Sequence, residues 1–211
     1  IIKNDFEVIN PSNEISYAFI SLGSKKDVNL AVKSAKDAFL TWSQVDKKEK
    51  IILLENLLKI YKSRWEEITV TMSDEMGAPL DWSSSAQTSS GADHIEDFIL
   101  RLKNFEFEKK FSDSSNNYIL YEPIGVCGLI TPWNWPINQI TLKVIPALAT
   151  GCTMILKPSE IAPLSGMLFA ELIHEAGFPA GVFNLVNGDG AGVGTDLSSH
   201  TDIDMISFTG S

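Results

Sequence analysis

The chain has 211 residues, of which 44% are hydrophobic and 21% charged, and its formal net charge is −10. These values are typical of a globular protein that can bury a core. Arg64 and Arg101 are the only arginines among 17 basic residues. Because arginine carries much of phosphate and base readout, the composition argues against nucleic-acid binding.

Two cysteines, Cys127 and Cys152, lie in apolar, strand-like stretches. Their number suits neither a disulfide framework nor a metal site, so we interpret them as small buried residues in a reducing cytoplasmic setting. The sequence has no signal-peptide pattern and no apolar run near the roughly 18 residues of a membrane span, so we expect no membrane association. Since the chain begins with Ile1 rather than Met, we expect it to be incomplete at the front.

The first half of the chain is expected to be mainly helical. A hairpin around Asn10-Pro11 precedes it, and Asp27 is a good N-cap for the first helix. Gly77 and Pro79 are typical of a helix end. The helices are expected over residues 28–42, 47–62, 65–75 and 81–103.

The second half changes to an alternation of strands and helices. After a polar turn at 111–117 and a short strand at 118–122, strands are expected at 126–130, 153–156, 182–186 and 205–208. Helices are expected between them, at 137–149, 163–176 and 190–200. This alternation predicts crossover units and an α/β fold with a Rossmann-like parallel sheet.

The segment Thr131–Pro136, T-P-W-N-W-P, follows the first of these strands. It could be a stiff apolar turn with Asn134 as a helix cap. Alternatively, the Asn134 amide is a neutral donor held rigidly by prolines, which suits the stabilisation of a developing oxyanion. The sequence leaves both interpretations open.

The segment Lys157-Pro158-Ser159-Glu160 follows the second strand. It could be a surface turn, or it could bind a ribose diol, with Lys157 donating to the hydroxyl oxygens and Glu160 accepting from the hydroxyls. A carboxylate in that place favours NAD over NADP because it repels a 2′-phosphate.

Two further turns are weaker signals. The glycine-rich stretch 188–194 departs from G-x-G-x-x-G and could be a plain turn or a place where a flat ligand approaches the backbone. Phe208-Thr209-Gly210-Ser211 ends a strand, where a following helix would create an anion site. Lys143 lies on the helix expected after T-P-W-N-W-P, and its default interpretation is a lysine on the solvated face of that helix.

Taken together, these segments resemble the NAD(P)-dependent aldehyde dehydrogenase superfamily over nearly the whole chain. Their order and spacing are more specific than any single one. The segments are Val8–Pro11, Glu75–Pro79, Glu122–Val126, P-W-N-W-P, K-P-S-E, Phe178–Asn184, Gly188–Gly190 and F-T-G-S.

The resemblance implies an NAD site, with NADP as an alternative cofactor. Residues 130–133 would run past the nicotinamide ribose, Lys157 and Glu160 would bind the adenosine ribose, and residues 208–211 would approach the pyrophosphate. Gly190 and Gly194 would flank the adenine. The implied contact residues are Ile130, Thr131, Pro132, Trp133, Lys157, Ser159, Glu160, Gly190, Gly194, Phe208, Thr209, Gly210 and Ser211.

The resemblance also implies catalytic and substrate positions. Asn134 would be the side-chain half of an oxyanion hole, and Lys143 is similar to a family lysine proposed for proton relay. Trp135, Gln139 and Leu142 would line the aldehyde tunnel, although a smaller aromatic is common in place of Trp135.

The family mechanism implies attack by a cysteine thiolate on the aldehyde, hydride transfer to NAD and hydrolysis of the thioester by a glutamate-activated water. Neither Cys127 nor Cys152 matches the nucleophile position. We therefore expect this chain to be the N-terminal part of an aldehyde dehydrogenase, inactive without the nucleophile and base that lie beyond Ser211 in the family.

The expected organisation has three parts. Residues 1–111 form a hairpin and the helical part of the NAD-binding domain, residues 112–124 begin a β-arm for oligomerisation, and residues 125–211 form an incomplete Rossmann-like core. The parent would be a homodimer or homotetramer acting on a small aldehyde. Two alternatives remain open: a CoA-acylating relative and a non-catalytic nucleotide-binding protein.

Overall fold

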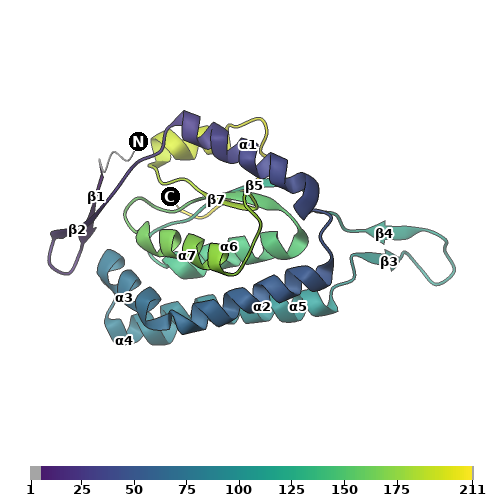
Figure 1. Cartoon of the computed structure of the whole chain (residues 1–211), viewed down its shortest axis with the longest axis horizontal. Helices are drawn as coiled ribbons and strands as arrows, with labels where there is room; N and C mark the ends of the chain where they lie inside the picture. Colours follow the sequence, from purple (N-terminus) through teal and green to yellow (C-terminus); the bar gives the residue numbers. More distant parts are fainter. Residues whose placement is uncertain (1–5, 211) are drawn as a thin grey trace.

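A parallel sheet lies at the centre of the molecule, in a computed structural model that describes residues 6–210 (Figure 1). Its strands are β5 (Val126–Ile130), β6 (Thr153–Lys157), β7 (Phe183–Leu185) and β8 (Met205–Phe208), in the order β7-β6-β5-β8. All three pairings are parallel. The predicted α/β class, with a parallel sheet in the second half of the chain, is therefore confirmed.

Helices cover both faces of this sheet, and β5 and β6 are therefore buried on both sides. Alternate strand residues contribute to different clusters: Cys127 and Leu129 belong to one core cluster, Val126 and Ile130 to the other. Helix α1 (Lys25–Trp42) packs on the second cluster, with α8 (Thr195–Ser198) beside it. The opposite face is covered by α6 (Pro136–Thr150) and α7 (Leu164–Glu175).

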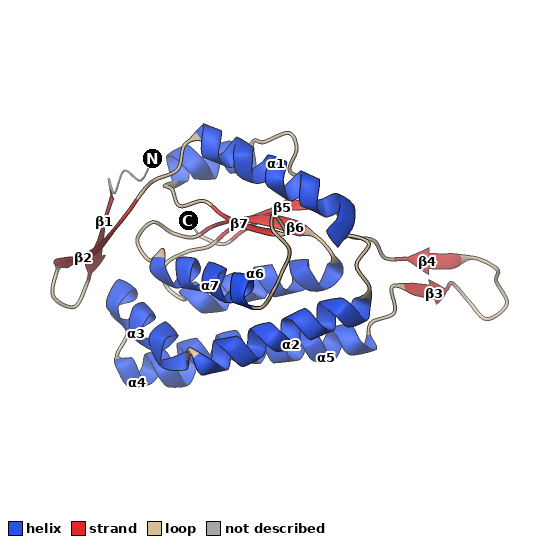
Figure 2. Ribbon diagram, in the orientation of Figure 1, coloured by secondary structure: helices blue, strands red, loops and turns tan. Residues whose placement is uncertain are grey.

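A further helical layer packs outside α6 and α7 (Figure 2). It contains α2 (Lys47–Ser63), α3 (Trp65–Met76) and α5 (Ser89–Asn104). Gly77 ends α3 in the left-handed conformation with φ 75°, as predicted. The helix predicted at 81–103 is divided into α4 (Leu80–Trp82), a π-helical turn at Ser83–Thr88 and α5.

The start of α1 differs from the prediction. Asp27 is not the N-cap: Ser24 takes that position, the helix begins at Lys25, and Asp27 closes a capping box. The Ser24 backbone N–H donates to the Asp27 carboxylate at 2.8 Å. An acidic side chain in the third helical position reaches back in this way, which is why the two assignments are easily confused.

Two antiparallel hairpins lie outside the main body (Figure 2). The first joins β1 (Phe6–Asn10) to β2 (Ile15–Ile20), as predicted. The second joins β3 (Glu108–Lys110) to β4 (Tyr118–Leu120) and projects away from the sheet. Strand β3 was not predicted, because its three residues are all charged and exposed. No helix within residues 6–210 is long and apolar enough to cross a membrane.

Candidate functional site

The carboxyl ends of β5, β6 and β8 lie side by side. Ile130 is in register with Lys157 on one side and with Phe208 on the other. Backbone hydrogen bonds continue past the strand ends, from Thr131 N to Lys157 O at 3.2 Å and from Thr209 N to Ile130 O at 3.1 Å. Three turns that the sequence places far apart therefore meet at one edge of the sheet.

The strand order also defines where a ligand would bind. From β5 the chain proceeds outward to β6 and β7, then returns to place β8 on the other side of β5. This reversal makes the gap between β5 and β8 a topological switch point, where open α/β sheets bind ligands at the carboxyl ends of their strands. The turns at residues 131–135 and 209–210 border it.

The T-P-W-N-W-P turn places Asn134 between β5 and α6. The N-cap of α6 is Trp135, which makes no side-chain capping bond, and Pro136 occupies the first turn. Asn134 is therefore not the cap that one interpretation of the sequence required. Its side chain is exposed, which leaves the amide available to a ligand.

Thr131 has a buried hydroxyl without a hydrogen-bond partner among the described residues. The residue is 3% exposed and lies at the end of β5. An unsatisfied buried hydroxyl costs about 1–3 kcal/mol, so such atoms call for an explanation. A polar ligand at the switch point would supply the partner, so this atom fits the cofactor that the sequence implies.

Lys157 and Glu160 form a pair at the end of β6. The Lys157 side chain is 4% exposed, and its Nζ donates to Glu160 Oε2 at 3.2 Å and to Pro158 O at 3.1 Å. This burial excludes the interpretation of the segment as a surface turn. The Glu160 side chain is 24% exposed, so the carboxylate can still reach solvent or a ligand. Ser159 Oγ accepts from Ile161 N at 3.3 Å and stabilises the turn locally.

Helix α6 carries Lys143 toward β8. Lys143 Nζ donates to Ser207 Oγ at 2.8 Å, and burial lowers the pKa of this lysine. The default interpretation of Lys143 as a solvated lysine is therefore wrong. Ser207 could not be predicted from the sequence, because this partner is 64 positions away.

Of the predicted tunnel residues, Trp135 is the N-cap of α6, and Gln139 and Leu142 lie in the first half of the helix. Trp135 contacts Trp82 edge-on, with ring centroids 4.9 Å apart. Sequence reasoning missed Trp82, which lies in α4. An exposed tryptophan just before a serine-rich segment was the available signal.

The other predicted positions are less closely connected. Gly190 and Gly194 lie in a π-helical turn that follows edge strand β7, and Asp189 accepts from Gly192 N there. No hydrogen bond among the described residues joins this turn to Lys157 or Glu160. Ser211 lies outside the described residues.

Cys127 and Cys152 are 0% and 4% exposed, as predicted. Cys127 is the second residue of β5 and Cys152 directly precedes β6, so both lie at the opposite end of the sheet from Asn134. Hydrogen bonding to Cys152 and burial raise the pKa of Cys127. Among residues 6–210 there is no cluster of three potential metal ligands.

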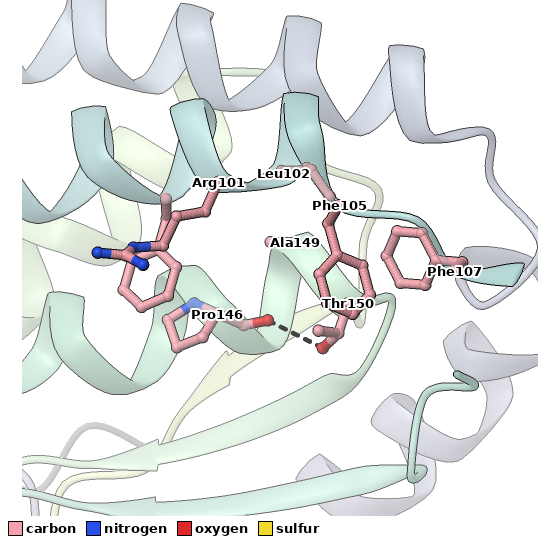
Figure 3. Close-up of a pocket in the computed structure, with 8 residues that line it drawn as sticks. Arg101, Leu102, Phe105, Phe107, Pro146, Ala149 and Thr150 are labelled. Atoms are coloured by element: carbon pink, nitrogen blue, oxygen red, sulfur yellow. Dashed lines mark hydrogen bonds between the residues drawn. The ribbon is translucent and has the colours of Figure 1, made fainter. Parts of the chain in front are cut away.

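An apolar pocket of about 200 Å³ lies between α5 and α6 (Figure 3). Phe98, Phe105, Phe107 and Pro146 contribute to its lining. None of the predicted site residues lines it, so we do not assign it to the site at the strand ends.

Comparison with known proteins identifies a family for almost the whole chain. The model of the aldehyde dehydrogenase family matches residues 2–211. Over 206 residues the chain is 48% identical to 3-succinoylsemialdehyde-pyridine dehydrogenase of a Pseudomonas species, which covers 97% of this chain and 43% of that protein.

Solved structures agree in fold. An aldehyde dehydrogenase of Bartonella henselae superposes with a TM-score of 0.96 and 54% identity, covering 98% of this chain and 44% of that one. Aldehyde dehydrogenase C of Pseudomonas syringae, solved with NAD⁺ and octanal, gives 0.92 and 44%, covering 95% and 41%. The chain thus spans less than half the length of these relatives.

Proposed function

Because the chain belongs to the aldehyde dehydrogenase family, we propose that it supplies the dinucleotide-binding part of an enzyme that oxidises an aldehyde to a carboxylic acid with NAD. The observation that carries the proposal is the meeting of the 131–135 turn, the Lys157–Glu160 pair and the end of β8 at one edge of the sheet, beside the switch point. A relative at 44% identity was solved with NAD⁺ and octanal, which supports the choice of cofactor and substrate class.

We assign the adenosine ribose to Lys157 and Glu160. The ammonium group donates to hydroxyl oxygens, and the partly exposed carboxylate accepts from hydroxyls and disfavours a 2′-phosphate. We propose that the backbone of 130–133 and the buried Thr131 hydroxyl contact the nicotinamide ribose, and that Phe208, Thr209 and Gly210, with Ser211 outside the described residues, contact the pyrophosphate. Gly190 and Gly194 are proposed to border the adenine.

In the proposed reaction, Asn134 donates from its amide to the oxygen that becomes negatively charged when a nucleophile adds to the aldehyde. Lys143, with its pKa lowered by burial, is proposed to relay a proton. Trp135, Gln139 and Leu142 would guide the aldehyde toward Asn134. Bound NAD supplies the hydride acceptor.

The projecting β3–β4 hairpin supports the proposal of a homo-oligomeric parent. Its strands are short, and most of their residues are exposed. Exposed strand edges of this kind offer backbone groups that can pair with another chain. We also propose that the parent protein is located in the cytoplasm, as expected from the sequence.

Titration of the purified full-length protein that carries this chain with NAD and with NADP tests the ribose assignment. The wild type should prefer NAD, and Glu160→Ala should bind NAD roughly ten- to a hundredfold more weakly because charged hydrogen bonds are lost. The preference over NADP should shrink as well. Glu66→Ala, at an exposed carboxylate in the first turn of α3, serves as the control. Equal wild-type affinity for the two cofactors would disprove the assignment.

A further inference from the structure

Helix α7 begins without a cap from its own sequence. Its N-cap residue is Pro163, which makes no side-chain hydrogen bond to the helix. The N–H groups of a first helical turn have no partner inside the helix and need acceptors from elsewhere. Here the acceptor is Glu75, which lies 89 positions before Leu164.

Glu75 is in the last turn of α3 and is 1% exposed. One carboxylate oxygen accepts from Leu164 N at 2.6 Å and the other from Ser165 N at 3.1 Å. These are the first two residues of α7. A carboxylate also interacts favourably with the positive end of the helix dipole.

The clamped helix start is one end of the turn that carries the proposed ribose site. Residues 158–163 connect β6 to α7 and include Glu160. At the other end of this turn, Lys157 is held in the fully buried strand β6. A connection this short, fixed at both ends, leaves few conformations in which Glu160 can face Lys157.

Helix α3 is itself well anchored where it holds Glu75. Asn10 Nδ2, from the β1–β2 hairpin, donates to the adjacent Asp74 at 3.2 Å. Gly77 then ends the helix with φ 75°, and its Cα faces Pro11 so closely that a Cβ would lie 2.7 Å from the proline ring. The carboxylate of Glu75 therefore extends from a rigid support.

We propose that Glu75 is a positioning residue for the dinucleotide: by binding the first two N–H groups of α7, it fixes the turn that presents Lys157 and Glu160 to the ribose. This inference rests on the proposed function of that pair. Glu75 does not contact the ligand in this assignment and acts through the turn.

Burying a carboxylate at this position is energetically unfavourable. That the protein nevertheless has one here supports a role for its two acceptor oxygens. Burial raises the pKa of Glu75 to about 7, against the opposing effect of the hydrogen bonds from Ser165 and Leu164. Glutamine would avoid this cost but has a single acceptor oxygen, whereas the helix start offers two donors. Two ionisable groups are neighbours of Glu75: Asp74, which precedes it in α3, and Tyr17, whose pKa is raised by burial and by the charges of Asp74 and Glu75.

The experiment compares wild type, Glu75→Gln and Glu66→Gln in the full-length protein that carries this chain. Glu66→Gln makes the same chemical change in the first turn of the same helix, at an exposed carboxylate. NAD affinity is measured at pH 6 and pH 8, and backbone amide exchange is followed over residues 157–165. Unfolding midpoints confirm that each variant is folded.

We expect Glu75→Gln to bind NAD roughly three- to tenfold more weakly at pH 8, the effect of losing one hydrogen bond. Wild-type affinity should fall by up to about tenfold from pH 8 to pH 6, because protonation near pH 7 removes one acceptor. This pH dependence should be much weaker in Glu75→Gln and unchanged in Glu66→Gln. Exchange at 157–165 should be faster in Glu75→Gln.

The other outcomes distinguish failure of the positioning role of Glu75 from failure of the proposed function. If Glu160→Ala weakens NAD binding but Glu75→Gln does not, the positioning role is wrong and the proposed function stands. If the wild type does not bind NAD, the proposed function fails, and amide exchange decides the clamp: unchanged exchange in Glu75→Gln overturns it, and faster exchange supports it. If Glu75→Gln does not fold, Glu75→Asp takes its place, because its shorter side chain cannot reach both N–H groups, and unchanged NAD affinity and amide exchange in that variant overturn the inference.

Discussion

Asn134 is held by a turn with little freedom. Pro132 and Pro136 restrict the backbone on either side of it, and the side chain is exposed at the switch point rather than spent on capping α6. A donor fixed in advance stabilises developing charge better than one that must be ordered during the reaction.

Asn134→Ala in the full-length protein should therefore lower kcat by about 10²- to 10³-fold, the usual effect of removing one oxyanion donor. NAD affinity should change little, since the proposed ribose contacts are untouched. Steady-state kinetics with an aliphatic aldehyde, together with NAD titration, measures both. Asn104→Ala, at the exposed end of α5, is the control. An unchanged kcat would remove Asn134 from the proposed mechanism.

Single residues show what local sequence can and cannot predict. The motifs identified Asn134, Lys157 and Glu160 as candidates, but each could equally have been an ordinary turn residue. What separates the alternatives is burial and partners: Lys157 is enclosed and Lys143 binds Ser207. Ser207 lies 64 positions from Lys143, and hydrophobic periodicity does not predict burial of a lysine or a contact across that separation.

At the scale of elements, α5 approaches α2 and α6 through Gly91. A Cβ on Gly91 would lie 2.3 Å from Tyr61 Oη and 2.4 Å from Ile137 Cγ2. Both of these side chains are fully buried, and Tyr61 Oη also donates to Thr88 O at 2.8 Å. Neither can move aside without breaking other contacts.

Gly91→Ala should therefore destabilise the protein by about 1–3 kcal/mol, the typical cost of overpacking. Chemical denaturation monitored by circular dichroism measures the free energy of unfolding. Gly190→Ala is the matched control, because a Cβ there meets nothing within 4 Å. A loss of stability no greater than that of the control would show that the helices can separate without penalty.

Most elements were predictable because their patterns are periodic. The parallel strands are short apolar runs, and the helices have repeating apolar positions, so their bounds agree closely with prediction. The exceptions have local causes. Strand β3 consists of charged residues held by pairing with β4 alone, and the π-helical turn at Ser83–Thr88 has no distinct sequence signal.

At the scale of the molecule, the sequence predicted a parallel sheet but not its strand order. The order β7-β6-β5-β8 depends on which side of β5 the chain returns to after α8, and this is a matter of tertiary packing. That return creates the switch point and brings Phe208 beside Ile130. The site is therefore a property of the whole sheet, although each of its turns can be recognised separately.

The position of the two cysteines leads to a prediction about the 211-residue chain by itself. Cys127 and Cys152 are buried at the opposite end of the sheet from Asn134, and the pKa of Cys127 is raised. A thiol becomes an effective nucleophile when its pKa is lowered and it can reach the substrate. Cys127 meets neither condition, and the burial of Cys152 keeps it from the substrate as well.

We therefore expect the purified 211-residue chain to produce no NADH from NAD and an aliphatic aldehyde, whereas the full-length protein does. Absorbance at the NADH band measures this directly, and Cys127→Ala and Cys152→Ala are compared in both forms. In the full-length protein each substitution should leave kcat within about twofold, because a small buried thiol is replaced by a residue of similar size. Turnover by the short chain that disappears in either variant would refute the assignment of both cysteines to the core.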